Sequence, residues 1–157
     1  MKKTILTFSL LLLTSVAFGG ERETIRDAHG KVVGTATTDG NKTVYRDAHG
    51  KVTGTATTNG NKTTCHDSSG RMTGTATENG NRTTFRDSSG KTTGTATTNG
   101  NRTTFREATG ASAGSSTSSG NRTTYRDALG SIVGTSTSTG SGSSSNQTPP
   151  ILNPTSK

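Results

Sequence analysis

Residues 41–60 read NKTVYRDAHGKVTGTATTNG, and this twenty-residue unit decides the fold. Six such units follow one another without insertions across residues 21–140. They begin at Glu21, Asn41, Asn61, Asn81, Asn101 and Asn121. A strict sequence period is typical of repeat architectures, in which each unit buries its apolar face against its neighbours. The fold is therefore predicted from one unit and the way it repeats.

Two turn signals divide each unit into two extended runs. Asp47-Ala48-His49-Gly50 has the Asp-x-x-Gly form of a tight turn, and Asn59-Gly60 is a strong hairpin signal. The runs between them are rich in Thr, Val and aromatic residues, which favour strands. Glycines recur at the tenth, fourteenth and twentieth positions, which excludes a helix. The unit is therefore predicted to be a pair of β-strands.

Counting outward from the two turns predicts which side chains share a face. A four-residue Asp-x-x-Gly loop would place Tyr45 opposite Val52, and a two-residue Asn-Gly loop would place Gly54 opposite Cys65. Positions three, five, twelve, fourteen and sixteen then form an apolar face, and positions two, four, six, eleven, thirteen, fifteen and seventeen form a polar one. The expected core residues at position five are Ile25, Tyr45, Cys65, Phe85, Phe105 and Tyr125.

These patterns predict an all-β repeat protein, an antiparallel β-meander or spiral sheet of six two-strand units. The alternative is a β-solenoid, in which each repeat stacks parallel on the last. The aromatic and the aliphatic side chain of each unit contribute roughly 1.5 to 3 kcal/mol each. Ordering the unit costs more, at about 1.5 kcal/mol per residue before hydrogen bonds are counted. The apolar face should therefore roll onto itself or pair with another copy or a partner.

The N-terminal segment has the features of an export signal. Two lysines precede an apolar run from Ile5 to Val16, and Ala17-Phe18-Gly19 offers small residues at the cleavage spacing. The apolar run is shorter than the ~20 residues that a bilayer requires, so we expect no transmembrane insertion after cleavage. The protein is expected in the periplasm, outside the cell or on the surface of a bacterium. The predicted parts are a signal peptide (1–19), six β repeats (20–140) and a disordered Ser/Gly/Pro tail (141–157).

Composition limits the partners and the chemistry. The net charge of +8 falls to +6 once Lys2 and Lys3 are removed with the signal peptide. A basic chain attracts anionic polymers. The single cysteine excludes an internal disulfide in the oxidising compartment to which the signal directs the chain. Stability must therefore come from the sheet.

The spacing of the repeat resembles the YD-repeat (RHS) family. Gly-x-x-Thr-x-Tyr followed by Asp-x-x-Gly-Lys/Arg occurs from Gly40 to Lys51 and again from Gly60 to Arg71, with Cys65 in place of Tyr. The resemblance covers residues 21–140. It implies a spiralling β-sheet and deployment in secreted shells or extended surface structures, and it implies no active site. The family's adjacent Tyr-Asp pair is interrupted here by Arg46, Arg86, Arg106 and Arg126.

Two columns of basic residues on the polar face are candidate polyanion-binding positions. They are Arg22, Lys42, Lys62, Arg82, Arg102 and Arg122 at position two, and Arg26, Arg46, Arg86, Arg106 and Arg126 at position six. Lipopolysaccharide, acidic polysaccharide or nucleic acid would be attracted there with strong salt dependence. The alternative is a solvated face whose charges prevent aggregation of sheets, aided by the neighbouring aspartates.

Paired threonines recur along the same polar face. They are Thr35-Ala36-Thr37, Thr55-Ala56-Thr57, Thr75-Ala76-Thr77 and Thr95-Ala96-Thr97. On a flat solenoid they would resemble the threonine arrays of ice-binding proteins. In a meander, Arg82 would sit among these hydroxyls, and threonine also favours strands in its own right. Ice binding is therefore a third alternative function for this face.

No catalytic, metal or cofactor site is predicted. Cys65 and His66 are adjacent in a strand and would point to opposite faces, which prevents a nucleophile and base pair. His29 and His49 would lie about 10 Å apart across two strands, too far to share a metal. We therefore expect a non-enzymatic, exported structural or surface protein that self-associates or binds a surface through its sheet. The alternative is a module that binds an anionic envelope or host polymer, with no small-molecule substrate.

Overall fold

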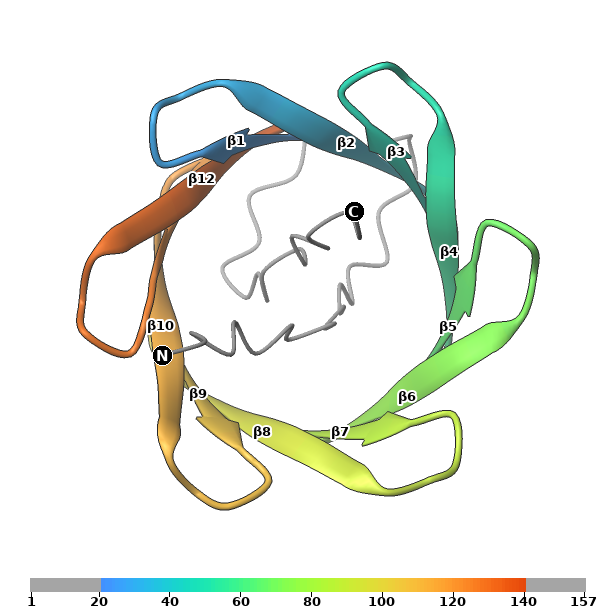
Figure 1. The fold of residues 1–157 in the computed structure, drawn as a ribbon, viewed down its shortest axis with the longest axis vertical. Helices are drawn as coiled ribbons and strands as arrows, with labels where there is room; N and C mark the ends of the chain where they lie inside the picture. The colour runs from blue at the N-terminus through green and yellow to red at the C-terminus, as the bar shows by residue number, and fades with distance from the viewer. Residues whose placement is uncertain (1–20, 141–157) are drawn as a thin grey trace, which may run out of the picture.

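The computed structural model describes residues 21–140, which form twelve antiparallel β-strands (Figure 1). The predicted signal peptide and C-terminal tail lie outside the described residues. Each repeat supplies one shorter and one longer strand. The bounds are β1 Glu21–Asp27, β2 Val32–Asp39, β3 Lys42–Asp47, β4 Val52–Asn59, β5 Lys62–Asp67, β6 Met72–Asn79, β7 Arg82–Asp87, β8 Thr92–Asn99, β9 Arg102–Glu107, β10 Ser112–Ser119, β11 Arg122–Arg126 and β12 Ile132–Thr139.

The strands close into a barrel. Each pairs with its neighbours along the chain, and β1 also pairs antiparallel with β12. The prediction of an all-β antiparallel meander is confirmed. The solenoid alternative is wrong, because consecutive strands are joined by tight hairpins and pair antiparallel rather than stacking as parallel coils. Closure rolls the thin apolar face onto itself and gives every described strand two neighbours.

The Asp-x-x-Gly segment forms a three-residue hairpin loop. The N–H of Gly50 donates to the carbonyl of Asp47 at 3.0 Å, and the N–H of Asp47 donates to the carbonyl of Lys51 at 2.9 Å. Gly50 has φ of +84°, which a side chain would disfavour. A tight turn followed by a left-handed glycine is a common three-residue hairpin connection. The loop is therefore one residue shorter than the four-residue loop that the sequence predicted.

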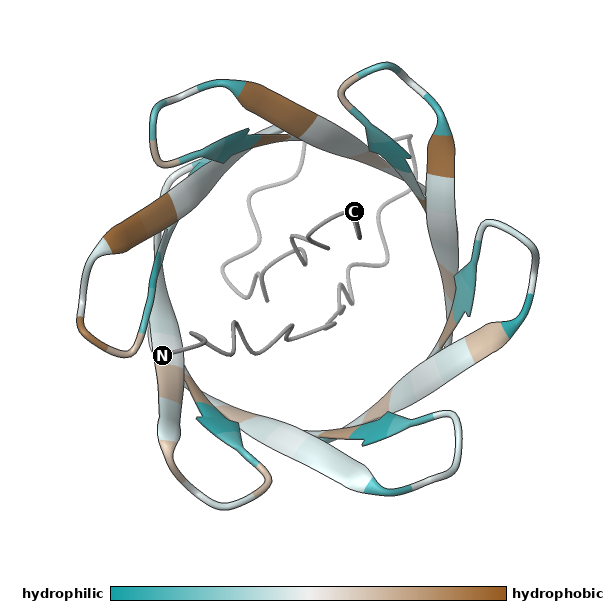
Figure 2. Cartoon of the chain, viewed as in Figure 1, coloured by the Kyte–Doolittle hydropathy of each residue, from teal (hydrophilic) through white to brown (hydrophobic). Residues whose placement is uncertain are grey.

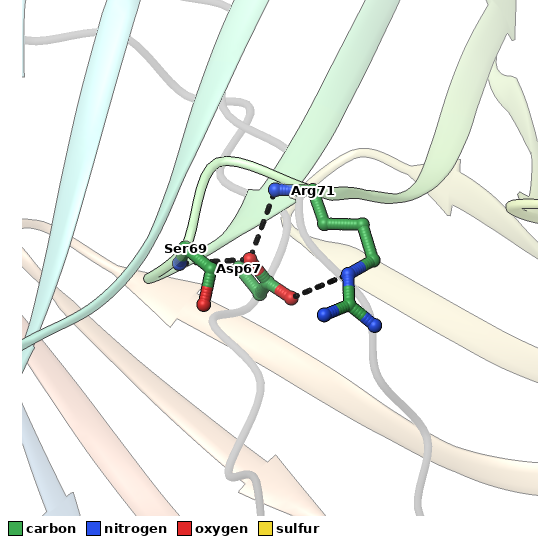
Figure 3. A network of polar contacts seen from close by, with 3 residues as sticks. All are labelled: Asp67, Ser69 and Arg71. Atoms are coloured by element: carbon green, nitrogen blue, oxygen red, sulfur yellow. Dashed lines mark hydrogen bonds and ion pairs between the residues drawn. The ribbon is translucent and has the colours of Figure 1, made fainter.

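The aspartate side chain holds this loop together. In the third repeat, Asp67 Oδ1 accepts hydrogen bonds from the backbone N–H of Ser69 at 2.8 Å and of Arg71 at 3.0 Å (Figure 3). The Arg71 Nε lies 3.9 Å from Asp67 Oδ2. The backbone hydrogen bond from Arg71 is the main cause that holds the pKa of Asp67 below its ordinary value. The same aspartate cap recurs in the first, second, fourth and sixth repeats.

A β-bulge follows each Asp-x-x-Gly loop and corrects the predicted register. Tyr45 pairs with Gly54 and Arg46 pairs with Val52, so one residue of β4 is inserted between two consecutive pairs. The predicted pairing of Tyr45 with Val52 is therefore wrong. Position twelve lies on the outer side with the arginine, whereas positions fourteen and sixteen keep the predicted face.

The second turn also differs from its prediction. Asn59 pairs with Lys62, which makes Gly60 and Asn61 the two loop residues instead of Asn59 and Gly60. Gly60 has φ of +60°, and none of the described non-glycine residues has positive φ. Positive φ at the first loop residue only is the pattern of a type II′ turn, which suits the twist of a hairpin. Consequently Cys65 pairs with Ala56 rather than with Gly54, a shift of two residues that preserves the alternation of faces.

Most of the buried side chains lie on the inner face of the barrel. They come from positions three, five and sixteen, and from position eighteen in Thr38 and Ser138; the strand glycine at position fourteen lies among them, and Ser115 and Thr135 at position fifteen are buried on the outer side. Ala76, Phe85, Ala96 and Phe105 form a hydrophobic cluster on this face. Gly54 faces a backbone constraint as well, because a Cβ there would meet the carbonyl oxygen of His66 at 2.6 Å. The sheet therefore requires a glycine at this position to bring neighbouring strands together.

Candidate functional site: the basic outer wall

Position two of the repeat gives the outer wall a ring of cations at the end where the Gly-Asn turns lie. We call it the turn-end ring; it consists of Arg22, Lys42, Lys62, Arg82, Arg102 and Arg122. All six residues are exposed, and within residues 21–140 none of their side chains makes a hydrogen bond or an ion pair. Register fixes the ring, because each cation is paired with the threonine at position seventeen of its own repeat. The sheet therefore holds six uncommitted cations at one height of the barrel.

Acidic residues near the turn-end ring are few: Asp39 pairs with Lys42, Glu21 precedes Arg22, and Glu78 precedes the partner of Arg82. Across the turn, the cation pairs with position nineteen of the preceding repeat, as Lys62 does with Asn59 and Arg82 with Asn79. This partner is acidic at one of the turns, where Asp39 pairs with Lys42. Asparagine, serine or threonine occupies the position in the other repeats. Cations therefore outnumber carboxylates at this end of the barrel, which favours anions there.

Position six gives a second ring at the opposite end, which we call the loop-end ring; it consists of Arg26, Arg46, Arg86, Arg106 and Arg126. These arginines are exposed, and each donates from a guanidinium nitrogen to the carbonyl of the loop glycine four residues later. The Arg46 to Gly50 bond is 2.9 Å, and the five bonds span 2.8 to 3.0 Å. His66 replaces arginine in the third repeat. The loop-end arginines therefore stabilise the hairpin loops in addition to carrying positive charge.

The two ends also differ in their balance of charge. An aspartate or glutamate follows every residue of the loop-end ring, as Asp47 follows Arg46 and Asp87 follows Arg86. These carboxylates lie beside the loop-end arginines and offset their field. The turn-end ring has no such partner in each repeat. Of the two predicted basic columns, the turn-end ring is therefore the better site for an anion.

Threonines fill the outer wall between the two rings. Thr57 pairs with Lys42 on one side and with Thr64 on the other, and Thr55 pairs with Val44 and with His66. The predicted threonine array exists, but it lies on a curved, closed wall and is bordered by long basic side chains. The ice-binding hypothesis depends on a flat threonine surface free of charges, and these residues do not form such a surface.

The position-five residues predicted as the core lie on the inner face. Ile25, Phe85, Phe105 and Tyr125 are buried, whereas Tyr45 and Cys65 are half-buried; the Tyr125 hydroxyl lies 2.9 Å from Ser136 Oγ. These six residues form no pair of reactive groups, because each aromatic is opposite a glycine and an alanine or serine of the neighbouring strands.

The cysteine and the histidines are placed apart. Cys65 pairs with Gly74 on the inner face and His66 pairs with Met72 on the outer face. Burial raises the pKa of Cys65 to about 11, which keeps the thiol protonated and unreactive at neutral pH. His29 and His49 lie in separate exposed loops. Among residues 21–140, no group of three or more His, Cys, Asp or Glu side chains is arranged to hold a metal ion.

Glu23 is the one notable inner residue that sequence reasoning did not identify. It occupies position three, where the other five repeats have threonine, and it is 5% exposed. Its Oε1 has no hydrogen-bond partner among the described residues. Burial raises the pKa of Glu23, and the hydroxyl of Ser136 partly offsets this rise. The departure from threonine at this position was a signal already present in the sequence.

No protein-family model, curated protein or solved structure matches this chain. Within residues 21–140 there is also no helix with the length and apolar character needed to cross a membrane.

Proposed function

We propose that this chain is an exported, non-enzymatic protein that binds an anionic polymer at the turn end of its barrel. The observation that carries the proposal is the turn-end ring, in which six exposed cations at equivalent positions have no side-chain partner within the described residues. Cations held at a surface without carboxylate partners attract polyanions and release their counterions on binding.

The spacing of the ring supports a polymer rather than a small anion. Neighbouring cations are separated by two strands, or about 10 Å around the wall, since strands lie ~4.8 Å apart. One small anion cannot bridge such a gap directly. A flexible chain of sulfates, phosphates or carboxylates that follows the wall would meet a new cation at each repeat. Threonine and asparagine side chains beside the ring add hydrogen-bond donors without adding opposing charge.

The proposal is tested by titrating the protein with heparin over a series of salt concentrations. A variant with Lys42→Gln, Lys62→Gln and Arg82→Gln loses half of the turn-end ring. If each contact contributes about 0.7 to the slope of log affinity against log salt, the loss of three contacts lowers the slope by about 2. The affinity at low salt should fall with it.

The matched control removes the same charge from the other ring, with Arg46→Gln, Arg86→Gln and Arg106→Gln. These arginines already bind loop carbonyls, so this variant should lower the slope by less than the turn-end variant. Equal slopes for the two variants would mean that net charge alone attracts the polymer. Binding that persists unchanged in high salt would refute the electrostatic proposal.

The second candidate is a structural or surface protein that acts through its sheet, as the resemblance to YD repeats implies. Closure of the barrel favours polyanion binding over a structural role. Every described strand already has two partners, so a single barrel offers no free edge for pairing with another sheet. A structural role would require the barrel to join other copies, which light scattering on the full chain would detect as a mass above that of the monomer.

A further inference from the structure

The β1–β12 pairing, which we call the seam, has the same register as the connections between consecutive repeats. Thr24 pairs with Thr137 at the seam, and Thr104 pairs with Thr97 at the equivalent point between β8 and β9. Every other pair of neighbouring strands is joined by a hairpin loop or turn, whereas the seam joins the first described strand to the last. The seam is thus the one place in residues 21–140 where the barrel can open without breaking a hairpin.

Inner side chains at the seam lack contacts that recur at most of its equivalents, although Thr139 Oγ1 donates a hydrogen bond of 3.1 Å to the Arg22 carbonyl across it. At the third position, Thr43, Thr63, Thr103 and Thr123 each share a hydroxyl hydrogen bond of 2.7 to 3.0 Å with position eighteen of the preceding repeat. Glu23 takes this place at the seam, opposite Ser138, and the Ser138 hydroxyl donates to Glu21 instead. Among the equivalents of the seam, β6 and β7 also lack the hydroxyl pair, because Glu78 lies opposite Thr83. At the fifth position the seam pairs Ile25 with Ser136, where β6 and β7 pair Ala76 with Phe85.

The surroundings of Glu23 contain no cation on the inner face. Glu21 on the same strand raises the pKa of Glu23, and Tyr45 of β3 and Tyr125 of β11 are the further titratable groups coupled to it. The inner residues of the adjacent β2 and β12 carry no charge. A carboxylate that is 5% exposed and has an unpartnered oxygen is poorly solvated in the closed ring. Opening the seam would return it to water.

We propose that the seam opens as a unit, that its two edges then pair with those of a second copy of this chain, and that Glu23 sets how readily opening occurs. The equality of registers supports this, because β1 of one copy meets β12 of another with the same pairing that closes a single ring. Exchange of identical elements between copies is a low-cost route to larger closed rings. The inference does not depend on polyanion binding.

Mixing two single-cysteine variants of the full chain tests the exchange. Thr24→Cys and Thr137→Cys, each in a Cys65→Ala background, would be incubated together and then oxidised in a brief pulse. Exchange through the seam places the two new cysteines opposite each other on different molecules, so a covalent heterodimer should form. The control mixture combines Thr97→Cys with Thr104→Cys, which are also half-exposed and have the equivalent register within the barrel.

The expected result is a heterodimer from the seam mixture and only the background of random collisions from the control. Equal yields from the two mixtures would show collision, and no heterodimer from either would show a seam that stays closed. Both outcomes overturn the proposal. Circular dichroism of each variant establishes that it is folded before mixing.

The role of Glu23 is tested by adding Glu23→Thr to both seam variants, which installs the residue of the other five repeats. Exchange should slow by about tenfold, because opening no longer returns an unsatisfied buried carboxylate to water. Exchange in the parent mixture should also be slower at acidic pH, because protonated Glu23 is tolerated in the closed barrel. Only the incubation would be at acidic pH, and the oxidation pulse would be at pH 8 in every case. Exchange that is insensitive to both changes would exclude Glu23 as the controlling group.

Discussion

The β6–β9 sector and the seam sector, β11, β12, β1 and β2, are built from the same repeat but differ in the side chains that they place on the inner face. In the first, Ala76, Phe85, Ala96 and Phe105 form a cluster on the inner face, and threonine begins β8 on the outside. In the second, the inner face carries Glu23 and serines beside Ile25, Ala36 and Tyr125, and further apolar residues lie near the loops of β2 and β12 (Figure 2). The repeat thus determines the backbone of the barrel, whereas residue differences between repeats determine which of its sectors are well packed.

The largest expected effect comes from the strong sector. Phe85 is 1% exposed, and its replacement by alanine should lower the free energy of unfolding by about 3 to 5 kcal/mol. Ile25→Ala should cost less, about 2 kcal/mol, because the seam gives this side chain a serine rather than an alanine as neighbour. Denaturant unfolding measures both. An equal or greater loss at Ile25 would contradict the proposed difference between sectors.

A smaller effect is expected where the strand glycine approaches a backbone carbonyl. Gly54→Ala places a Cβ near the carbonyl oxygen of His66, at 2.6 Å before relaxation, and should cost about 1 to 3 kcal/mol. Thr53→Ala in the exposed bulge beside it is the control, with an expected change within about 0.5 kcal/mol. If both variants unfold at the same denaturant concentration as the parent, the close approach does not exist.

Removal of the unpartnered carboxyl should stabilise the seam. Glu23→Thr is expected to raise the free energy of unfolding by about 1 to 3 kcal/mol at neutral pH, the usual cost of leaving a buried polar group unsatisfied. Folding of the barrel raises the pKa of Glu23. The stabilisation that this raised pKa gives the parent protein is therefore complete below the ordinary glutamate pKa of 4.5. This stabilisation is lost as pH rises through the raised pKa. The stability gain of the variant should therefore shrink on acidification, as unfolding curves at several pH values would show.

Acid should have the opposite effect on the Asp-x-x-Gly loops. Hydrogen bonds within the folded loops lower the pKa of both aspartates. The main one for Asp67 comes from the backbone N–H of Arg71, and the main one for Asp87 comes from the Ser89 hydroxyl. Their contribution is therefore present above the ordinary value of 3.8 and is lost as pH falls through the lowered values. Asp67→Asn should reduce the acid sensitivity of thermal unfolding. Unchanged acid sensitivity in this variant would show that the cap carries no pH dependence.

The smallest effect is expected at the exposed apolar tip of the seam sector. Leu129 is 92% exposed, so Leu129→Ser should change the free energy of unfolding by less than about 0.5 kcal/mol. The same substitution should reduce any non-specific association of the barrel, since exposed apolar groups promote it. A large loss of stability would mean that Leu129 packs against another part of the protein.

Much of this fold could be read from one repeat, and the exceptions have physical causes. Strand pairing, both turns and the alternation of faces follow from Asp-x-x-Gly, Asn-Gly and the recurring glycines. The exact pairing did not follow, because a bulge moves Val52 to the outer side and because Gly60 rather than Asn59 opens the turn. Such displacements depend on local backbone geometry to which residue counting is insensitive.

Closure and the candidate site were predictable to different degrees. The two basic columns were visible in the sequence, but their inequality depends on which guanidinium reaches a loop carbonyl, as Arg46 reaches Gly50. Closure into a ring depends on the twist and tilt accumulated over twelve strands, which no single repeat contains. Glu23 becomes significant only once closure places it beside β12.

A disulfide within one molecule is the most direct test of closure through β1 and β12. The double variant Thr24→Cys with Thr137→Cys, in a Cys65→Ala background and at high dilution, would be oxidised beside Thr97→Cys with Thr104→Cys. The barrel predicts a monomer with an internal disulfide in both cases, because the two pairs have the same register. An internal disulfide in the second variant and none in the first would show an open sheet and contradict the closed ring.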